Sequence, residues 1–306
     1  MINHFKFGNY KRRYSLKIFA MSVFFLFFLS VLFFEFCEQV DGEIIHVGGT
    51  EPEGYSTIQE AIDAATISDT VYVYEGVYYE NIVIDKSINL VGENSRTTII
   101  DGRIAGNTIK VNADFVTIER FTIMHSGLIY PNSGINLSSN HNTIKDNIIQ
   151  SNFYGMTLYY SSNNTILRNT IQNDDHCGIY LSASSNNSIS NNTIKNHNYN
   201  GVGVYYSSDG NIIENNTFIS NDFCGVNIRV CKNNMVLNNN FTDNYIGVHI
   251  PDSSNIVDGN VFSGNNIDVE KESFLSESES FLAVNVVIIL IIIIVVFYIF
   301  RFKKRK

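Results

Sequence analysis

The sequence predicts a parallel β-helix, an all-β solenoid in which each coil stacks on the one before it. The main observation is the phrase apolar-x-x-Asn-x-apolar, which recurs six times at spacings of 21 to 24 residues. A fixed period of this kind marks a unit that buries its apolar face only against copies of itself. The unit is too short for paired helices, and its Ile, Val, Thr and Tyr residues alternate with period 2, which favours strands. We therefore predict a right-handed coil of three short strands, because a left-handed hexapeptide helix would have a shorter period.

The asparagine of each phrase is expected to face inward and to form a ladder along one corner of the solenoid. Equivalent residues on successive coils lie ~4.7–4.9 Å apart, and an amide offers both donors and an acceptor to its neighbours. A low-complexity tract would also be rich in asparagine, but it would not need apolar residues in constant phase with the asparagines. The predicted ladder consists of Asn147, Asn169, Asn192, Asn216, Asn239 and Asn260.

Two apolar runs flank the repeats and divide the chain. The first follows a basic segment and suits either a signal peptide or a signal anchor. The second contains 20 residues and precedes a basic tail, which predicts a membrane span with its carboxyl end in the cytoplasm. The predicted segments are residues 1–42, the basic N-terminus with signal peptide or anchor; 43–268, the β-helix, with its clearest repeats in 118–266; 269–280, an acidic, serine-rich stalk; 281–300, the membrane span; and 301–306, the cytoplasmic tail.

The charges predict an extracellular and acidic β-helix on a membrane anchor. Of the 21 Lys and Arg residues, ten lie in residues 1–17 and 301–306, which leaves eleven against 30 acidic residues in between. Nucleic acid is an unlikely partner for such a surface, since binding to phosphates requires a basic face. Neutral polysaccharides and other cell-surface proteins are compatible with it.

Six glycosylation sequons agree with an exported chain. None of their asparagines belongs to the predicted ladder, so modification is sterically compatible with the fold. The sequons begin at Asn136, Asn163, Asn186, Asn191, Asn215 and Asn240.

Residues 56–65 are expected to form one short amphipathic helix that covers the first coil. This segment and the strands after it resemble the NosD-like proteins with the carbohydrate-binding and sugar-hydrolase (CASH) repeat, right-handed parallel β-helices of the pectin-lyase-like fold. The motifs that carry the resemblance are YSTIQEAIDAA (55–65), DTVYV (69–73), YENIVI (79–84), KSINLVG (86–92) and TTIIDG (97–102).

The resemblance covers about residues 44–266 and implies an exported, often archaeal, cell-surface protein. Some members of the family act on polysaccharides, and some are periplasmic and associated with copper. Two features depart from the family pattern, namely the predicted C-terminal anchor and Phe121, which stands where the ladder would have asparagine.

A recurring glycine begins one strand of each coil, and the residues after it alternate between apolar and polar. By this alternation we expect a row of side chains to point outward and form one exposed face. Tyrosines on such a face can stack on sugar rings, although tyrosine is also frequent in strands for its propensity alone. The predicted glycan-binding residues are Tyr159, Tyr180, Tyr205, Asn227, Arg229 and His249, with Thr157 on the same face.

Acidic residues in the turn before that glycine provide the alternative function, an enzyme that acts on polysaccharides. Glycosidases use paired carboxylates as acid and base, and the resemblance implies that a lyase of this fold would use Ca²⁺. The candidate catalytic residues are Asp174, Asp175 and Asp222. The seven histidines show no ligand pairing, so no metal site is predicted from the residues. A structural or carbohydrate-binding role is thus the first hypothesis, catalysis the second, and a NosD-type metal-associated accessory role the third.

Overall fold

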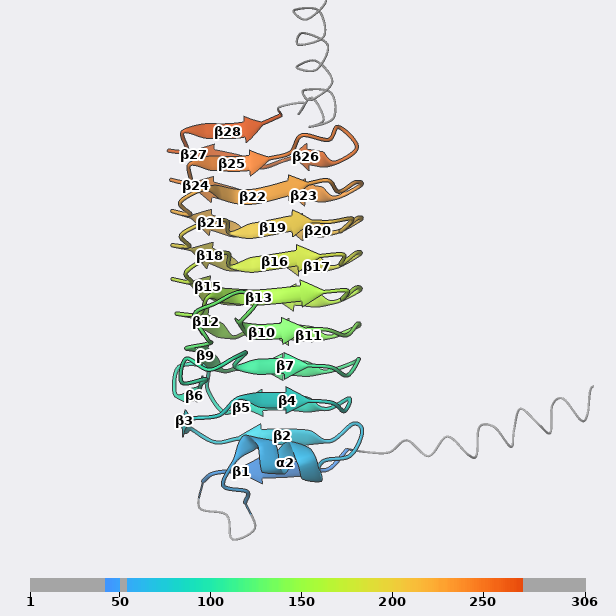
Figure 1. Cartoon of the computed structure of the whole chain (residues 1–306), viewed down its shortest axis with the longest axis vertical. Coiled ribbons are helices and arrows are strands. Elements are labelled where there is room, and N and C mark those ends of the chain that lie inside the picture. The colour runs from blue at the N-terminus through green and yellow to red at the C-terminus, as the bar shows by residue number, and fades with distance from the viewer. Residues whose placement is uncertain (1–41, 50–53, 272–306) are drawn as a thin grey trace, which may run out of the picture. The chain divides into compact units, whose positions relative to one another are not determined.

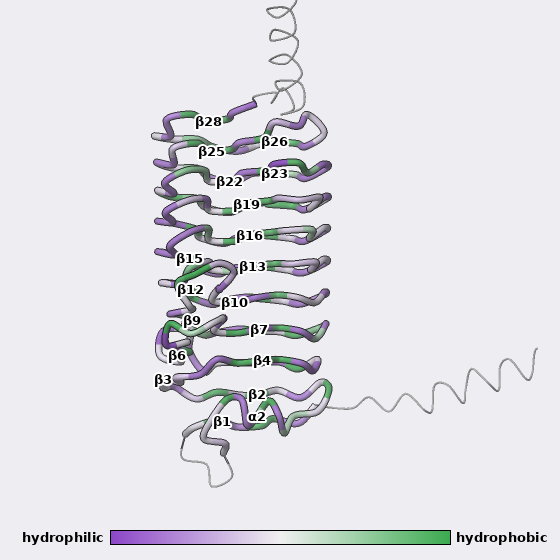
Figure 2. Tube along the Cα trace, in the orientation of Figure 1, coloured by the Kyte–Doolittle hydropathy of each residue, from purple (hydrophilic) through white to green (hydrophobic). Residues whose placement is uncertain are grey.

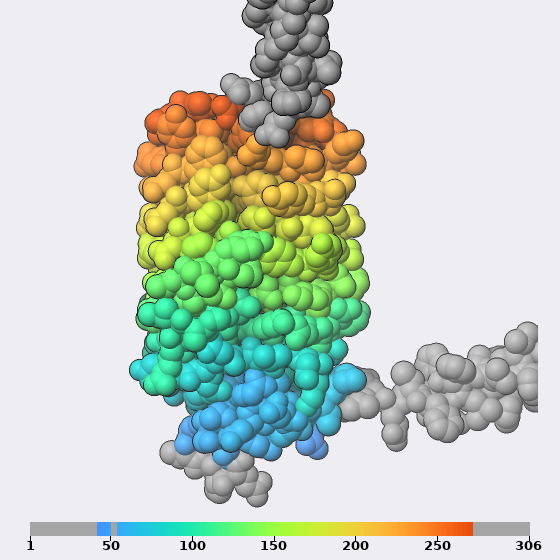
Figure 3. Space-filling view, in the orientation of Figure 1, coloured from blue at the N-terminus to red at the C-terminus, as the bar shows by residue number. Residues whose placement is uncertain are grey.

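The protein forms a parallel β-helix in a computed structural model that describes residues 42–49 and 54–271 (Figure 1). Each coil contributes one strand to each of three parallel sheets, and the first sheet contains ten strands. The coils follow one another along the solenoid in chain order, as the space-filling view shows (Figure 3). The prediction of a parallel β-helix is therefore confirmed.

The strands are short and pair in register with their equivalents on the neighbouring coils. The first sheet contains β1 (Ile44–Val47), β2 (Thr70–Val73), β5 (Asn89–Gly92), β8 (Thr117–Glu119), β11 (Thr143–Lys145), β14 (Thr165–Leu167), β17 (Ser188–Ser190), β20 (Ile212–Glu214), β23 (Met235–Leu237) and β26 (Ile256–Asp258). The second contains β3 (Gly76–Tyr78), β6 (Thr98–Asp101), β9 (Thr122–Met124), β12 (Ile148–Gln150), β15 (Thr170–Gln172), β18 (Thr193–Lys195), β21 (Thr217–Ile219), β24 (Asn240–Thr242) and β27 (Val261–Ser263). The third contains β4 (Ile82–Ile84), β7 (Ile109–Val111), β10 (Ser133–Leu137), β13 (Tyr154–Tyr159), β16 (Ile179–Ser182), β19 (Val202–Tyr205), β22 (Cys224–Arg229), β25 (Ile246–His249) and β28 (Ile267–Glu270).

The core consists of columns of apolar side chains, to which each coil contributes at least one from each sheet. In one coil, Ile166, Ile171 and Ile179 come from the three sheets, and all three are fully buried. Burying such a side chain contributes about 1.5–3 kcal/mol. Apolar and polar residues alternate along the trace for this reason (Figure 2). The alternation that predicted strands is the alternation between core and surface.

Three polar ladders, and not one, run along the corners of the solenoid. In the predicted ladder, the side-chain oxygen of each asparagine from Asn169 to Asn260 accepts the backbone N–H of the ladder residue one coil earlier. A second ladder lies five residues before it and contains Asn142, Asn164, Asn187, Asn211, Asn234 and Asn255. A third lies five residues after it and contains Asn152, Asp174, His197, Asn221, Asn244 and Asn265.

Helix α2 (Ile58–Ala64) covers the first coil, as predicted, and buries Ile58, Ala61 and Ile62. Its N-cap is Thr57, whose hydroxyl accepts the N–H of Glu60. The Glu80 carboxylate accepts two further N–H groups of the first turn, which stabilises the helix end.

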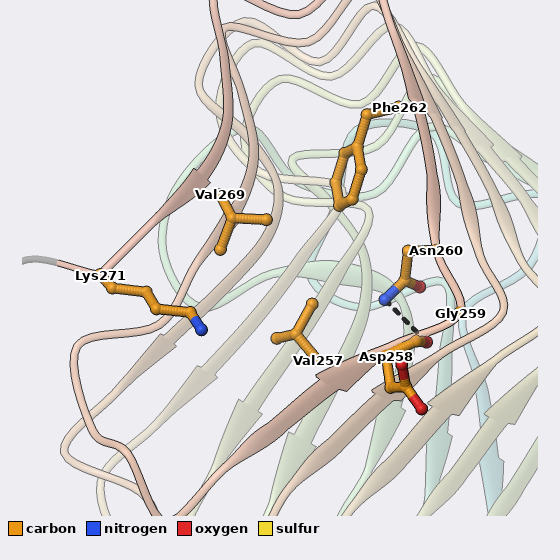
Figure 4. A pocket seen from close by; sticks show the side chains of 7 residues that line it. All are labelled: Val257, Asp258, Gly259, Asn260, Phe262, Val269 and Lys271. Carbon is orange, nitrogen blue, oxygen red and sulfur yellow. Dashed lines mark hydrogen bonds between the residues drawn. The ribbon is translucent and has the colours of Figure 1, made fainter.

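At the other end, the last described coil leaves a cavity of about 230 Å³ over its core positions (Figure 4). Val257, Phe262 and Val269 line the cavity, and Figure 4 shows their side chains turned toward it. The equivalent residues one coil earlier, Val236, Phe241 and Val248, are fully buried.

The predicted leader up to residue 41, the membrane span and the cytoplasmic tail lie outside the described residues. Of the predicted stalk, residues 272–280 also lie outside them, whereas Val269 and Glu270 belong to β28. Within residues 42–49 and 54–271, no helix has the length and apolar character needed to cross a membrane.

Candidate functional site

The outer face of the third sheet carries three tyrosines that touch one another across successive coils. Tyr159 of β13 and Tyr205 of β19 share one row with Ser182 between them, whereas Tyr180 of β16 lies in the adjacent row. The ring of Tyr180 lies 5.8 Å from that of Tyr159 and 5.2 Å from that of Tyr205. We call this half-buried group of Tyr159, Tyr180 and Tyr205 the tyrosine platform.

The Tyr205 ring lies back along its own strand because Gly203 leaves room for it. A Cβ atom at position 203 would lie 2.5 Å from Cε2 of this ring. The Tyr205 hydroxyl accepts a hydrogen bond of 2.9 Å from the side-chain amide of Asn200. The contact with Gly203 and the hydrogen bond to Asn200 together fix the orientation of the Tyr205 ring in the absence of a ligand.

The hydroxyl of Tyr159 is buried and faces the hydroxyl of Tyr130, without a hydrogen bond of standard geometry within the described residues. A tyrosine hydroxyl offers one donor and two acceptor sites, so it can bond to a further partner. Burial raises the pKa of Tyr180 to about 12 and also raises the pKa of Tyr159 and of Tyr205. The platform hydroxyls therefore stay protonated at neutral pH and can donate as well as accept.

The connection between β9 and β10 borders the platform. Its residues Leu128, Ile129 and Tyr130 are exposed, and the Tyr130 ring lies 6.3 Å from that of Tyr154. The backbone N–H of Tyr154 donates to the carbonyl of Asn132, which fixes this connection against β13. In the space-filling view the connection rises from the surface beside the neighbouring coils (Figure 3).

The remaining residues predicted for this face do not form one flat exposed surface. Thr157 is fully buried and contacts Ser133 and Asn136 from the coil before. Asn227 and His249 are also buried, and Nδ1 of His249 lies 2.9 Å from the Asn227 side-chain oxygen. The hydrogen bonds of Asn136 with Thr157 and of His249 with Asn227 run along the row, between in-register residues of successive coils, and alternation within a single strand cannot reveal them. Arg229 is exposed at the end of β22.

A second aromatic column, which the sequence analysis missed, runs along the turns that lead into the third sheet. Neighbouring rings lie 4.7 to 6.4 Å apart, and those of Tyr199 and Phe223 are nearly parallel, at 8°. The rings of Tyr199, Phe223 and Tyr245 stack on one another, whereas those of Phe153 and His176 are tilted, so the stacked part presents mainly ring edges to solvent. Its members are Phe153, His176, Tyr199, Phe223 and Tyr245.

The three candidate catalytic carboxylates lie in different environments. Asp174 belongs to the third ladder, and its side chain is fully buried. Asp175 and Asp222 are exposed and occupy the same turn position two coils apart, since each backbone N–H donates to a third-ladder carbonyl one coil earlier. Asn198 takes this position on the coil between them.

The described residues contain no group of three or more His, Cys, Asp or Glu side chains placed to hold a metal. The nearest pairing of nitrogen and sulfur is Nδ1 of His176, 3.2 Å from Sγ of Cys177. Burial raises the pKa of that thiol to about 12. One histidine and one thiol are also fewer donors than the His₂Cys set of a blue-copper site.

The three sheets, the ladders and the stacked coils define a right-handed parallel β-helix protein of the pectin-lyase-like fold. Residues 62–277 match the family described as "Periplasmic copper-binding protein (NosD)", and the chain belongs to this family. The donor set described above does not fit the copper that the family description implies, so we derive no chemistry from copper.

Solved structures share the fold at low sequence identity. The catalytic domain of a GH87 alpha-1,3-glucanase in complex with nigerose is 15% identical, with a TM-score of 0.61, over 74% of this chain and 46% of that one. The GH136 lacto-N-biosidase from Eubacterium ramulus is 13% identical, with a TM-score of 0.56, over 73% and 56% of the two chains. ORF18 of Geobacillus virus E2 is 15% identical, with a TM-score of 0.54, over 89% and 64%.

The chain thus spans about half the length of the glucanase chain that it matches. No curated protein sequence matches it.

Proposed function

We propose that this protein binds a neutral polysaccharide through the tyrosine platform. The observation that carries the proposal is the arrangement of Tyr205, fixed over Gly203 and bonded to Asn200, beside the tilted ring of Tyr180. A tyrosine combines a ring that packs on the apolar face of a sugar with a hydroxyl that bonds to sugar hydroxyls. Stacking on preformed rings also costs little conformational entropy on binding.

The buried hydroxyl of Tyr159, which faces Tyr130 without a hydrogen bond of standard geometry, supports a ligand rich in hydroxyl groups. A sugar hydroxyl could satisfy this buried oxygen, whereas an apolar ligand would leave it unpaired at a cost of about 1–3 kcal/mol. The acidic turn residues Asp175 and Asp222 disfavour polyanionic chains.

The proposal is tested by incubating the purified full-length protein with a panel of insoluble polysaccharides. The assay measures both the protein retained and the reducing or unsaturated ends released. We expect retention without release, and we expect retention to be lost in the Tyr159→Ala, Tyr180→Ala, Tyr205→Ala triple variant. Retention that is unchanged in the triple variant would contradict the assignment to this face.

Catalysis is the second candidate, and one observation favours it. Asp175 and Asp222 stand two coils apart, which places their backbones at ~9.6 Å by twice the strand spacing. This is close to the separation of about 6.5–9.5 Å between the carboxyl groups of inverting glycosidases. Release of reducing ends that is abolished in Asp175→Asn and in Asp222→Asn would assign this activity. Asp174 is the weaker part of that candidate because its carboxyl is buried.

We further propose that the β-helix lies outside the cell, anchored through residues 281–300. The support is the hydrophobic run with its basic tail and a family described as periplasmic. Protease treatment of intact cells that carry the protein, with terminal tags on both ends, tests this topology. Protection of the C-terminal tag together with cleavage of the β-helix is the expected pattern.

A further inference from the structure

The third ladder contains two residues that break its pattern in successive coils. Its standard unit is seen at Asn221, whose backbone N–H and side-chain amide both donate to the side-chain oxygen of Asn244. Asp174 and His197 replace asparagine at two neighbouring positions, and both are fully buried. These replacements bring two titratable groups together inside the solenoid.

One carboxyl oxygen of Asp174 accepts the hydrogen bonds that an asparagine oxygen would accept at this ladder position, and the other oxygen has no hydrogen-bond partner. Oδ1 accepts the backbone N–H of Asn152 at 2.9 Å and its side-chain amide at 3.2 Å. Oδ2 is buried without a hydrogen bond, and it lies 3.5 Å from Nδ1 of His197.

The contacts of His197 identify its tautomer. Nδ1 lies 3.3 Å from the backbone nitrogen of Asp174 and accepts that N–H, so it carries no proton. Nε2 lies 3.2 Å from the carbonyl oxygen of Ile171 and donates to it. The imidazole is therefore neutral, and no positive charge stands beside the Asp174 carboxyl.

An ionised Asp174 would be a buried charge with one unpaired oxygen. Such a charge costs several kcal/mol, and the group takes up a proton instead. A charged His197 could pair with it only by placing a proton on Nδ1, which would remove the acceptor of the Asp174 N–H. We propose that Asp174 carries a proton on Oδ2, 3.5 Å from Nδ1 of His197, and that this neutral acid–imidazole pair makes the stability of the middle of the solenoid depend on pH.

The two hydrogen bonds from Asn152 favour the ionised form of Asp174, but burial outweighs them, and among the described residues no positive charge faces the carboxyl. Asp174 is faced by Asn152 from the coil before and His197 from the coil after, and Asp175 is the charged group that acts on it. Packing is tight, since a Cβ atom on Gly155 would lie 2.6 Å from Oδ2 of Asp174. Burial accordingly raises the pKa of Asp174 well above its usual value, and burial lowers the pKa of His197 to about 3.

The proposal gives the pair a characteristic dependence on pH. Between about pH 4 and 6.5, the pair holds one proton in either state: on Asp174 when folded, and on His197 when unfolded. Above about pH 6.5 the unfolded pair loses its proton while the folded pair keeps it. The unfolding equilibrium constant contributed by the pair then rises about ten-fold per pH unit until folded Asp174 ionises.

Asp174→Asn leaves His197 as the only titratable group of the pair. Above about pH 6.5 His197 is neutral in both the folded and the unfolded state, so this site no longer makes the stability of the variant depend on pH. The ratio of wild-type to variant unfolding constants should therefore grow about ten-fold per pH unit above that point. His197→Asn leaves only the acid, so its loss of stability should begin near pH 4. Each substitution introduces the standard ladder residue, which keeps the fold.

The experiment is urea unfolding of the full-length protein and the variants from pH 4 to 9, with Asp222→Asn as an exposed control. Infrared spectroscopy of the folded wild type at pH 7 should show a protonated carboxyl band that is missing in Asp174→Asn. The absence of this band, or wild-type and Asp174→Asn curves that run parallel above pH 6.5, would overturn the proposal. An imidazolium signal from folded His197 at pH 7 would instead establish an ion pair and also contradict it.

Discussion

The side-chain oxygen of Asn192 accepts two hydrogen bonds from Asn169 one coil earlier, from the backbone N–H at 2.8 Å and from the side-chain amide at 3.1 Å. The second amide hydrogen of Asn169 is donated to the carbonyl of Ile144. Each ladder residue thus joins three coils and satisfies turn groups that have no partner within their own coil. The ladder fixes the register of the coils as well as adding hydrogen bonds.

Replacement of Asn192 by leucine should destabilise the protein by at least about 2 kcal/mol. The change leaves the buried N–H of Asn169 without an acceptor, and each such loss costs about 1–3 kcal/mol. The matched control is Asn191→Gly, because Asn191 is exposed and has a φ of 56°, which glycine adopts without strain. Urea denaturation should separate the two variants, and equal midpoints would contradict the inward assignment.

Gly203→Ala should weaken polysaccharide binding while leaving the fold intact. The added methyl group collides with the Tyr205 ring, the end of a side chain that can swing away, so stability should change by less than about 1 kcal/mol. Retention on the polysaccharide should fall to the level of Tyr205→Ala. Tyr79→Ala removes an exposed tyrosine that stacks on Arg103 elsewhere, and it should bind as the wild type does.

Tyr159→Phe should separate binding from stability. Because the Tyr159 hydroxyl has no hydrogen bond of standard geometry within the described residues, its removal should leave the melting temperature unchanged or raise it slightly. If a sugar hydroxyl bonds to it, the affinity should fall about 5- to 10-fold, which corresponds to roughly 1–1.5 kcal/mol. A drop in melting temperature with no change in affinity would show that the hydroxyl bonds only within the protein.

Asp69 should make the first coil sensitive to acid. Its carboxylate accepts the backbone N–H of Thr66 and that of Glu43, and these bonds lower its pKa below 3.8. A lowered folded pKa means that the stabilisation is present above the unfolded pKa and is lost as the pH falls through the folded pKa. Asp69→Asn should cost about 1.5–3 kcal/mol at pH 7. The difference from wild type, measured by urea denaturation, should shrink steadily below pH 4, whereas a constant difference would contradict this role.

Glycosylation should spare one of the six sequons. Asn136 is 7% exposed, and its side-chain amide donates to Thr157, whereas the other five sequon asparagines are exposed. Expression in a glycosylating host followed by peptide mass spectrometry should find Asn136 unmodified. A glycan on Asn136 would contradict this prediction and would mean that β10 is accessible to the glycosylation machinery before the third sheet forms.

The fold could be predicted because its repeat unit is short and its core residues alternate strictly. Two further ladders carry an equally regular signal, since their members stand five residues before and five residues after each residue of the first. The third was harder to see because Asp174 and His197 interrupt the asparagines. Asp174 and His197 are buried because ladder positions face inward. A search for exposed catalytic carboxylates does not identify such positions.

The site was predicted only in part, because contacts between coils depend on register. Alternation indicates that Tyr159, Tyr180 and Tyr205 leave the core, but it does not show that Tyr180 stands in a different row from the other two. The second aromatic column was not recognised because turn lengths vary. Phe153 follows Asn147 of the first ladder by six positions, whereas His176 follows Asn169 by seven.

The most direct test of the account is the affinity of the full-length protein for the polysaccharide that it retains, compared with the affinity of the Tyr159→Ala, Tyr180→Ala, Tyr205→Ala variant. Isothermal titration with soluble fragments of that polysaccharide gives both values, and Tyr79→Ala serves as the control. We predict a loss of at least 100-fold, roughly 3 kcal/mol, in the triple variant alone. Equal affinities for the wild type and the triple variant would show that the tyrosine platform is not the binding site.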